Sequence, residues 1–248
     1  MQVPAVTGIL RIMTSVKCDA DDGACRVTDA VSRKGGSHAT MVAPEIVYYG
    51  DPMCSWCWGA SPQLIELRDW CKGRDLPFRI VLGGLRAGGG DPWDTRFREF
   101  LRHHWREVAE RTGQPFNERI LDWTSFEYDT EPACRAVVAA RSMCLEDELG
   151  FFAEIQRRFY VDNQDPKLPE FYPAICRIFD LNEDSFRERF ESAVTRQRTR
   201  ADFAISRSSG ITGYPSVTLK RGLDEAIIAT GFATFDEMRE FVDQRLPG

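Results

Sequence analysis

Residues 48–59 read YYGDPMCSWCWG, and the predicted fold is built outward from this stretch. The apolar run at residues 46–49 is typical of a buried β-strand, and it ends at a Gly-Asp-Pro turn. Cys54 and Cys57 follow, and the next residues, to about Cys71, have helical spacing. Unpaired N–H groups and the positive end of the helix dipole lie at a helix start, so they favour Cys54 as a thiolate nucleophile. Cys57 lies one turn along and can resolve a mixed disulfide.

The CxxC has two other interpretations. It can be half of a zinc site, but zinc needs four ligands. The chain has no second CxxC, and His103 and His104 are adjacent, so they cannot form an i,i+4 ligand pair. The two cysteines can also be buried structural residues. The order strand, turn, CxxC and helix favours redox chemistry over both alternatives.

The composition excludes several classes of protein. The chain has 248 residues, 43% of them hydrophobic and 28% charged, with a net charge of −6. This acidic balance, without a basic stripe, predicts no nucleic-acid partner. No apolar run reaches the roughly 18–20 residues that a membrane span needs. The eight cysteines are too sparse for a disulfide scaffold. Those outside the CxxC, if free, would risk wrong pairing in an oxidising compartment, so we expect a cytoplasmic protein.

The rest of the pattern completes an α/β fold. A second strand is predicted at residues 78–82, which makes the opening segment a parallel βαβ unit. A hairpin is predicted near the C-terminus, with its first strand in the β-rich run at residues 211–219 and its second at residues 225–229, followed by a closing helix at residues 235–246. Helical spacing fills the chain between them, including one helix at residues 185–208. We therefore predict a thioredoxin-like fold with an inserted all-helical domain. The expected segments are a flexible N-terminal extension (1–43), a discontinuous thioredoxin-like domain (44–90 and 207–247) and a helical insertion domain (91–206).

Three stretches, at residues 51–59, 129–136 and 213–216, resemble DsbA-family thioredoxin-fold proteins, especially the FrnE-like branch. The resemblance covers roughly residues 44–247. It implies a protein disulfide oxidoreductase or disulfide isomerase that acts on disulfide-containing proteins or small thiols. We expect neither a metal nor a resident cofactor, with glutathione as a possible reductant.

The resemblance also implies roles for individual residues. Cys54 and Cys57 are the catalytic pair, and Ser55 and Trp56 form the dipeptide between them. This dipeptide has no histidine to stabilise the Cys54 thiolate, so we expect a less oxidising protein than DsbA itself. Trp58 either contacts substrate or only packs in the core.

Pro215 is implied to be a cis proline beside the cysteines, where the Tyr214 backbone can pair with a substrate chain. The alternative is an ordinary trans proline at a strand entry. Many thioredoxin-fold oxidoreductases have a buried carboxylate six residues before the first cysteine, but this chain has Tyr48 there. Asp51 is the residue that can take over proton handling, or it only forms the Asp-Pro turn.

Two other functions stay open. Related proteins that resemble 2-hydroxychromene-2-carboxylate isomerases or kappa-class glutathione transferases bind glutathione, but they typically have serine where Cys54 stands. A redox-sensing or chaperone-like binding protein is the non-catalytic alternative, since a fold alone does not decide function.

Overall fold

The computed structural model describes residues 16–18, 25–27 and 42–246, and the chain divides into two units, residues 1–39 and 40–248. In the first unit, β1 (Val16–Cys18) and β2 (Cys25–Val27) pair antiparallel. The rest of the extension predicted at residues 1–43 lies almost entirely outside the described residues.

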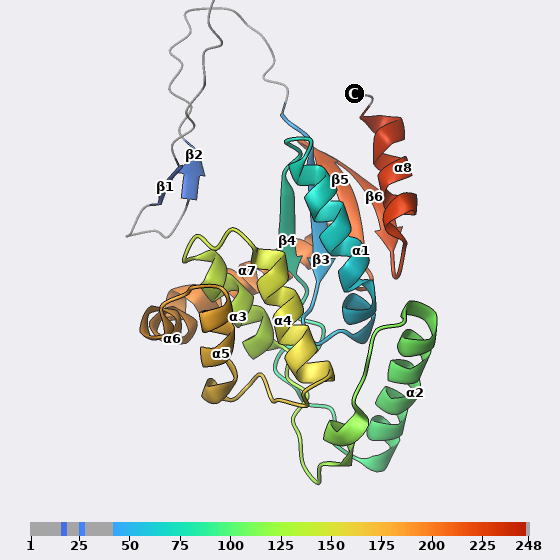
Figure 1. The fold of residues 1–248 in the computed structure, drawn as a ribbon, viewed down its shortest axis with the longest axis vertical. Helices are drawn as coiled ribbons and strands as arrows, with labels where there is room; N and C mark the ends of the chain where they lie inside the picture. Colours follow the sequence, from blue (N-terminus) through green and yellow to red (C-terminus); the bar gives the residue numbers. More distant parts are fainter. Residues whose placement is uncertain (1–15, 19–24, 28–41, 247–248) are drawn as a thin grey trace, which may run out of the picture. The chain divides into compact units, whose positions relative to one another are not determined.

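The second unit begins with a strand, a helix and a strand and ends with a hairpin and a helix, as the sequence predicts. Its elements, in chain order, are β3 (Glu45–Gly50), α1 (Ser55–Lys72), β4 (Phe78–Leu82), α2 (Thr95–Thr112), η1 (Glu118–Asp122), α3 (Glu131–Arg141), α4 (Glu148–Tyr160), η2 (Pro169–Phe171), α5 (Pro173–Ile178), α6 (Glu183–Glu191), α7 (Ala193–Ser208), β5 (Ser216–Arg221), β6 (Asp224–Thr230) and α8 (Phe235–Arg245). Figure 1 shows this order along the chain.

The strands of this unit form one sheet in the order β4-β3-β5-β6. β3 and β4 are parallel, with Tyr48 opposite Ile80, which confirms the predicted βαβ unit. β5 runs antiparallel to both β3 and β6, so the predicted hairpin is also confirmed. With its helices, this sheet makes the predicted α/β, thioredoxin-like fold.

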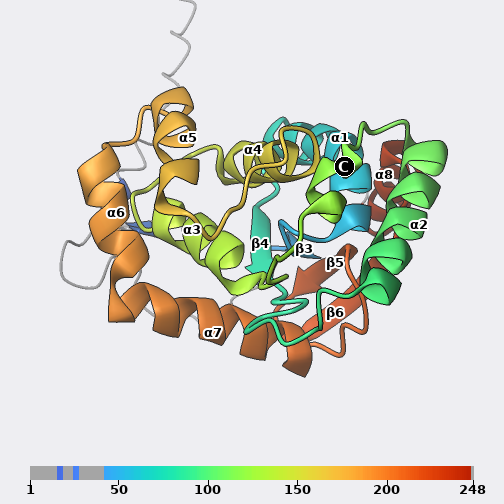
Figure 2. The same ribbon diagram turned by 90° about the horizontal axis from the view of Figure 1, so that it is seen from below.

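Strand β3 is buried on both faces of the sheet. Ile46 and Tyr48 belong to the large apolar core that α1 and α8 help to form. Val47 and Tyr49 point the other way, into a small cluster with Val81. Figure 2 shows α1 on one side of the sheet and α7 on the other. The CxxC follows β3, and Cys54 and Cys57 belong to the same large core as Ile46 and Tyr48.

The helices between β4 and β5 fall largely within residues 91–206, and a separate insertion domain there stays a prediction. Residues 40–248 form one compact unit. The single helix predicted at residues 185–208 is wrong, because α6 and α7 are separate helices. They meet at Ser192, whose backbone is extended and whose hydroxyl accepts a hydrogen bond from the Thr195 amide at 3.1 Å. A serine in this position ends one helix and caps the next.

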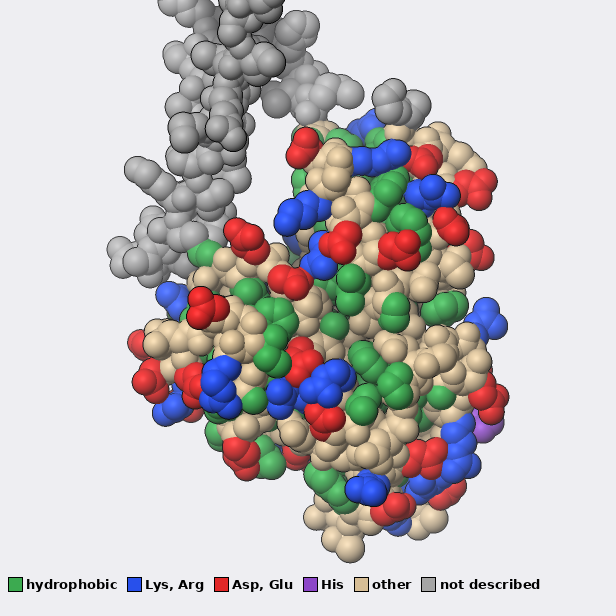
Figure 3. Space-filling view, viewed as in Figure 1, with side chains coloured by type: hydrophobic (Ala, Val, Ile, Leu, Met, Phe, Trp, Pro, Cys, Tyr) green, Lys and Arg blue, Asp and Glu red, His purple; other side chains and the backbone are tan. Residues whose placement is uncertain are grey.

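The surface of the described unit carries mixed charge. Acidic and basic side chains are interspersed over the face in Figure 3, and no continuous basic area crosses that face. None of the helices in the described part of the chain has the length and apolarity needed to cross a bilayer.

Candidate active site

Cys54 is the residue that begins α1. It occupies the N-cap position with an extended backbone (φ −92°, ψ 119°), and the first turn that follows contains no acidic residue. Its side chain is 5% exposed. Its thiol donates a hydrogen bond to the Tyr214 carbonyl oxygen at 3.5 Å. The sulfur therefore lies at the positive end of a helix, against the loop before β5.

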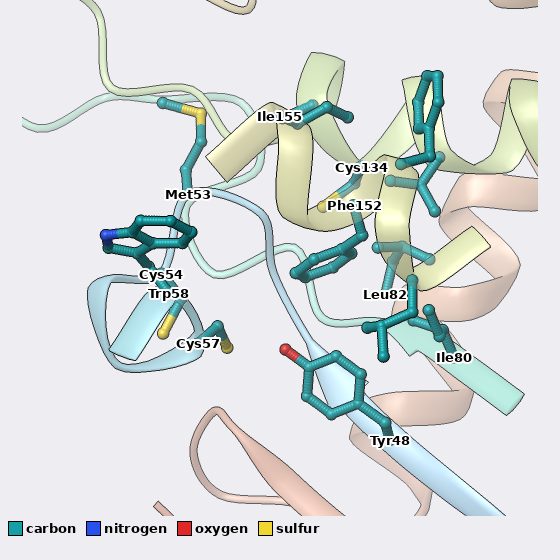
Figure 4. Packing of buried hydrophobic residues seen from close by; sticks show 14 of the residues in the cluster. Tyr48, Met53, Cys54, Cys57, Trp58, Ile80, Leu82, Cys134, Phe152 and Ile155 are labelled. Atoms are coloured by element: carbon teal, nitrogen blue, oxygen red, sulfur yellow. The ribbon is translucent and has the colours of Figure 1, made fainter. Parts of the chain in front are cut away.

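Cys57 lies one turn further into the helix and is fully buried. Both cysteines are free thiols. Burial raises the pKa of the Cys57 thiol well above its ordinary value, and the adjacent Cys54 adds to the rise. The Tyr48 side chain and the Asp51 backbone amide oppose it. Figure 4 shows the Cys57 sulfur between the Cys54 sulfur and the Tyr48 hydroxyl. This arrangement provides one outer thiol and one protected thiol behind it.

The Tyr214–Pro215 peptide bond is cis, as the resemblance implies. The Tyr214 hydroxyl donates to the Gly83 carbonyl at 3.0 Å and lies 2.8 Å from the Ser206 hydroxyl. A Cβ at Gly83 would overlap the Tyr214 ring, so glycine is needed for this close approach. The structure thus brings Tyr214 and Pro215 beside Cys54, as the resemblance implies.

Asp51 is fully buried, but its carboxylate is already occupied. It accepts hydrogen bonds from the Met53 amide at 2.8 Å, the Leu85 amide at 2.7 Å and the Cys134 thiol at 3.5 Å. Burial raises the pKa of Asp51, and the backbone donors lower it in part. Asp51 therefore ties the CxxC turn to the loop after β4, and proton handling by this residue stays a prediction.

The tryptophans of the CxxC segment differ in exposure. Ser55 and Trp56 are half-buried at the start of α1. Trp58 is only 7% exposed, and its indole nitrogen donates to the Pro115 carbonyl at 3.0 Å. The Gln114 side-chain amide donates in turn to the Trp58 carbonyl at 3.0 Å. These contacts agree with a structural role, which is one of the two alternatives for Trp58. Substrate contact by Trp58 stays a prediction.

Sequence reasoning assigned no role to two buried residues of the site. Cys134 lies in one of the stretches that carry the resemblance, and its thiol contacts Asp51. Tyr128 donates from its hydroxyl to the Met53 carbonyl at 2.7 Å, which fixes the turn before Cys54. No local pattern around Tyr128 predicts this contact, because it joins segments far apart in the chain.

Among the residues that the structure describes, no group of three or more His, Cys, Asp or Glu side chains is arranged to hold a metal ion. The two thiols lie beside the Tyr48 hydroxyl, the Tyr214 carbonyl oxygen and each other. These groups suit sulfur exchange, in which the outer sulfur attacks and the inner one follows.

No protein-family model matches the chain, but individual proteins do. The chain is 35% identical to a candidate protein disulfide isomerase from Nitrosomonas europaea, with a TM-score of 0.75 over 82% of this chain and 97% of that one. It is 28% identical to the cytosolic disulfide reductase DsbM from Pseudomonas aeruginosa, with a TM-score of 0.68 over 81% of this chain and 98% of that one. DsbM also has a structure with glutathione. The ClpXP adapter protein SpxH of Halalkalibacterium halodurans is 22% identical over 244 residues, which are 93% of this chain and 78% of the relative.

Proposed function

The chain belongs to the DsbA-like disulfide oxidoreductases of thioredoxin fold, and from this premise we propose that it reduces disulfides through Cys54 and Cys57, with glutathione as its reductant. The substrates are disulfides of proteins or mixed disulfides with small thiols. The observation that carries the proposal is the pairing of an outer thiol at a helix start with a fully buried thiol one turn behind it.

The exchange takes two steps. The Cys54 thiolate attacks one sulfur of the substrate disulfide, forming a Cys54–substrate disulfide and releasing the other substrate sulfur as a thiolate, which takes up a proton. Cys57 then loses its proton and attacks the Cys54 sulfur. The Cys54–Cys57 disulfide forms, and the second substrate thiol leaves reduced. Two glutathione molecules restore the dithiol and leave as glutathione disulfide.

The reducing direction is supported by the surroundings of the thiols. A disulfide is a strong oxidant when the protein stabilises its reduced form, chiefly as a thiolate. The Ser55-Trp56 dipeptide offers no positive charge to a thiolate, and Cys57 has a raised pKa. The 28% identity to a cytosolic disulfide reductase supports the same direction and a cytoplasmic location.

The test is reduction of insulin disulfides and of a glutathione-mixed disulfide, with glutathione and its reductase as the supply of electrons. We expect turnover by the wild type and loss of turnover, on the order of a thousandfold or more, in Cys54→Ser, because a serine hydroxyl does not ionise near neutral pH. Cys57→Ala is expected to accumulate the mixed disulfide. Equal turnover by wild type and Cys54→Ser would contradict the proposal.

A second candidate is a partner-binding protein whose cysteines switch binding. The similarity to the ClpXP adapter SpxH favours it. It predicts partner binding that depends on the redox state of Cys54 and Cys57 without multiple turnovers. A binding assay with the oxidised and the reduced protein, next to the turnover assay, separates the two functions.

A further inference from the structure

Tyr48 has a buried hydroxyl that lies beside Cys57 and lowers the pKa of that thiol. The side chain is fully buried, and its oxygen has no hydrogen-bond partner of good geometry among the described residues. Buried polar groups are normally paired, because an unpaired one loses its hydration without compensation. An unpaired hydroxyl next to reactive thiols therefore requires an explanation.

The orientation of the Tyr48 ring is fixed by its neighbours. A Cβ at Gly50 would overlap the ring and the hydroxyl, so the ring passes directly over this glycine. On α4, Phe152 makes an edge contact with the ring, with the centroids 5.6 Å apart and the planes at 66°. Figure 4 shows the hydroxyl directed from the end of β3 towards the Cys57 sulfur. The packing thus holds the hydroxyl at the inner thiol.

Few other groups compete for this position. Cys54 and Tyr48 are the titratable side chains with the largest effects on the pKa of Cys57. In the loop before β5, the pKa of Tyr214 is raised in part by the charge of Cys57. The nearby carboxylate of Asp51 is engaged by Met53, Leu85 and Cys134. The Asp51 backbone amide donates a hydrogen bond to Cys57. The Tyr48 hydroxyl is therefore in a position to donate to the inner sulfur.

We propose that the Tyr48 hydroxyl donates a hydrogen bond to the sulfur of Cys57 when this thiol ionises, and that it thereby speeds the resolving step. The inference rests on the proposed function, since it concerns the second step of the same exchange. It gives a neutral donor the position that a buried carboxylate has in many proteins of this fold.

Tyr48 keeps its proton throughout the resolving step. Burial raises the pKa of Tyr48 well above its ordinary value, so the hydroxyl keeps its proton and is a donor, not a base. The Cys57 proton leaves to solvent, and the Cys57 sulfur attacks Cys54. The departing thiolate takes up a proton from solvent. A hydrogen bond to the charged form of Cys57 favours that form.

The test follows single turnovers of the reduced full-length protein with the aromatic disulfide dithiobis(nitrobenzoate), whose two halves absorb when released. Attack by Cys54 releases the first half, and attack by Cys57 releases the second. Cys54→Ser and Cys57→Ala identify the two phases against the reactions of other thiols. The two rates are measured over a range of pH.

We expect Tyr48→Phe to leave the first phase within about twofold and to slow the second about ten- to a hundredfold, the range for a hydrogen bond to a charged group. The second phase of the variant should also shift to higher pH. Tyr49→Phe is the matched control, because it removes the hydroxyl of the neighbouring buried tyrosine on the opposite face of β3, and it should change neither phase.

The outcomes separate this inference from the proposed function. A second phase that is unchanged in Tyr48→Phe at every pH overturns the role of Tyr48 alone. A wild type without a Cys57-dependent second phase overturns both. Thermal unfolding checks the fold of Tyr48→Phe. As a second variant, fluorotyrosine at position 48, a stronger donor, should shift the second phase to lower pH, and an unchanged profile there also contradicts the inference.

Discussion

Tyr48 and Tyr49 are neighbours on β3, and both are fully buried, yet their hydroxyls have opposite fates. Tyr49 donates to a Glu225 carboxylate oxygen at 2.6 Å and contacts the Ser209 hydroxyl at 3.0 Å. Tyr48, on the other face, has no such partner among the described residues. The Tyr49 hydroxyl joins β3 to β6 and to the residue that follows α7, whereas the Tyr48 hydroxyl lies beside the thiols. Burial alone therefore does not tell a structural hydroxyl from one available for chemistry.

The largest expected effect comes from moving the Tyr48 ring without touching Tyr49. In Gly50→Ala the new methyl group overlaps a ring that Phe152 also contacts. We expect a loss of about 2–3 kcal/mol in the free energy of unfolding, typical of overpacking, measured by urea denaturation. Gly73→Ala is the control, since its Cβ would meet no atom closer than 3.5 Å. Equal stability of Gly50→Ala and wild type would show that the ring is not confined.

A smaller effect is expected on the Tyr49 face. Tyr49→Phe removes the hydrogen bonds to Glu225 and Ser209, while Thr218 continues to donate to Glu225 at 2.7 Å. We expect about 1–2 kcal/mol lower unfolding free energy, measured by the same denaturation, with disulfide turnover unchanged. A loss of turnover without a loss of stability would reverse the assignment of the two faces.

The smallest effect is a dependence on alkaline pH. Burial, and then the hydrogen bond to Glu225, raise the pKa of Tyr49 to about 12 from its ordinary value of 10.0. Because the folded protein holds this proton more tightly than the unfolded chain, the stability it contributes is complete below pH 10 and is lost as the pH rises to about 12. The gap in unfolding free energy between wild type and Tyr49→Phe should therefore close over this interval. A constant gap would contradict the raised pKa.

Local patterns in the sequence predict the framework of the site well. The strand before the CxxC, the helix that Cys54 begins and the strand at residues 78–82 follow from apolar spacing and turn residues, and all three are present. The resemblance predicts the cis Pro215 beside the thiols, and the structure has this cis bond. These features depend on neighbours in the chain or on stretches that are similar to those of known proteins.

Contacts between distant segments are what the sequence does not predict. The direction of the Tyr48 hydroxyl depends on the contact of its ring with Phe152. The hydrogen bonding of the Asp51 carboxylate depends on the Leu85 amide. The helix break at Ser192 was missed for another reason. The residues on both sides of Ser192 continue the helical spacing, and serine also occurs inside helices. The observed capping bond from the Thr195 amide to Ser192 therefore identifies the boundary.

The bonds between Trp58 and the segment after α2 have a consequence for protein engineering. Pro115 receives the indole N–H, and Gln114 returns a bond to the backbone of the same tryptophan. Trp58 directly follows Cys57. Replacing the segment after α2 with that of a relative would therefore also change the packing next to the reactive sulfurs. Chimeras that exchange this region should therefore keep both partners of the Trp58 contacts together.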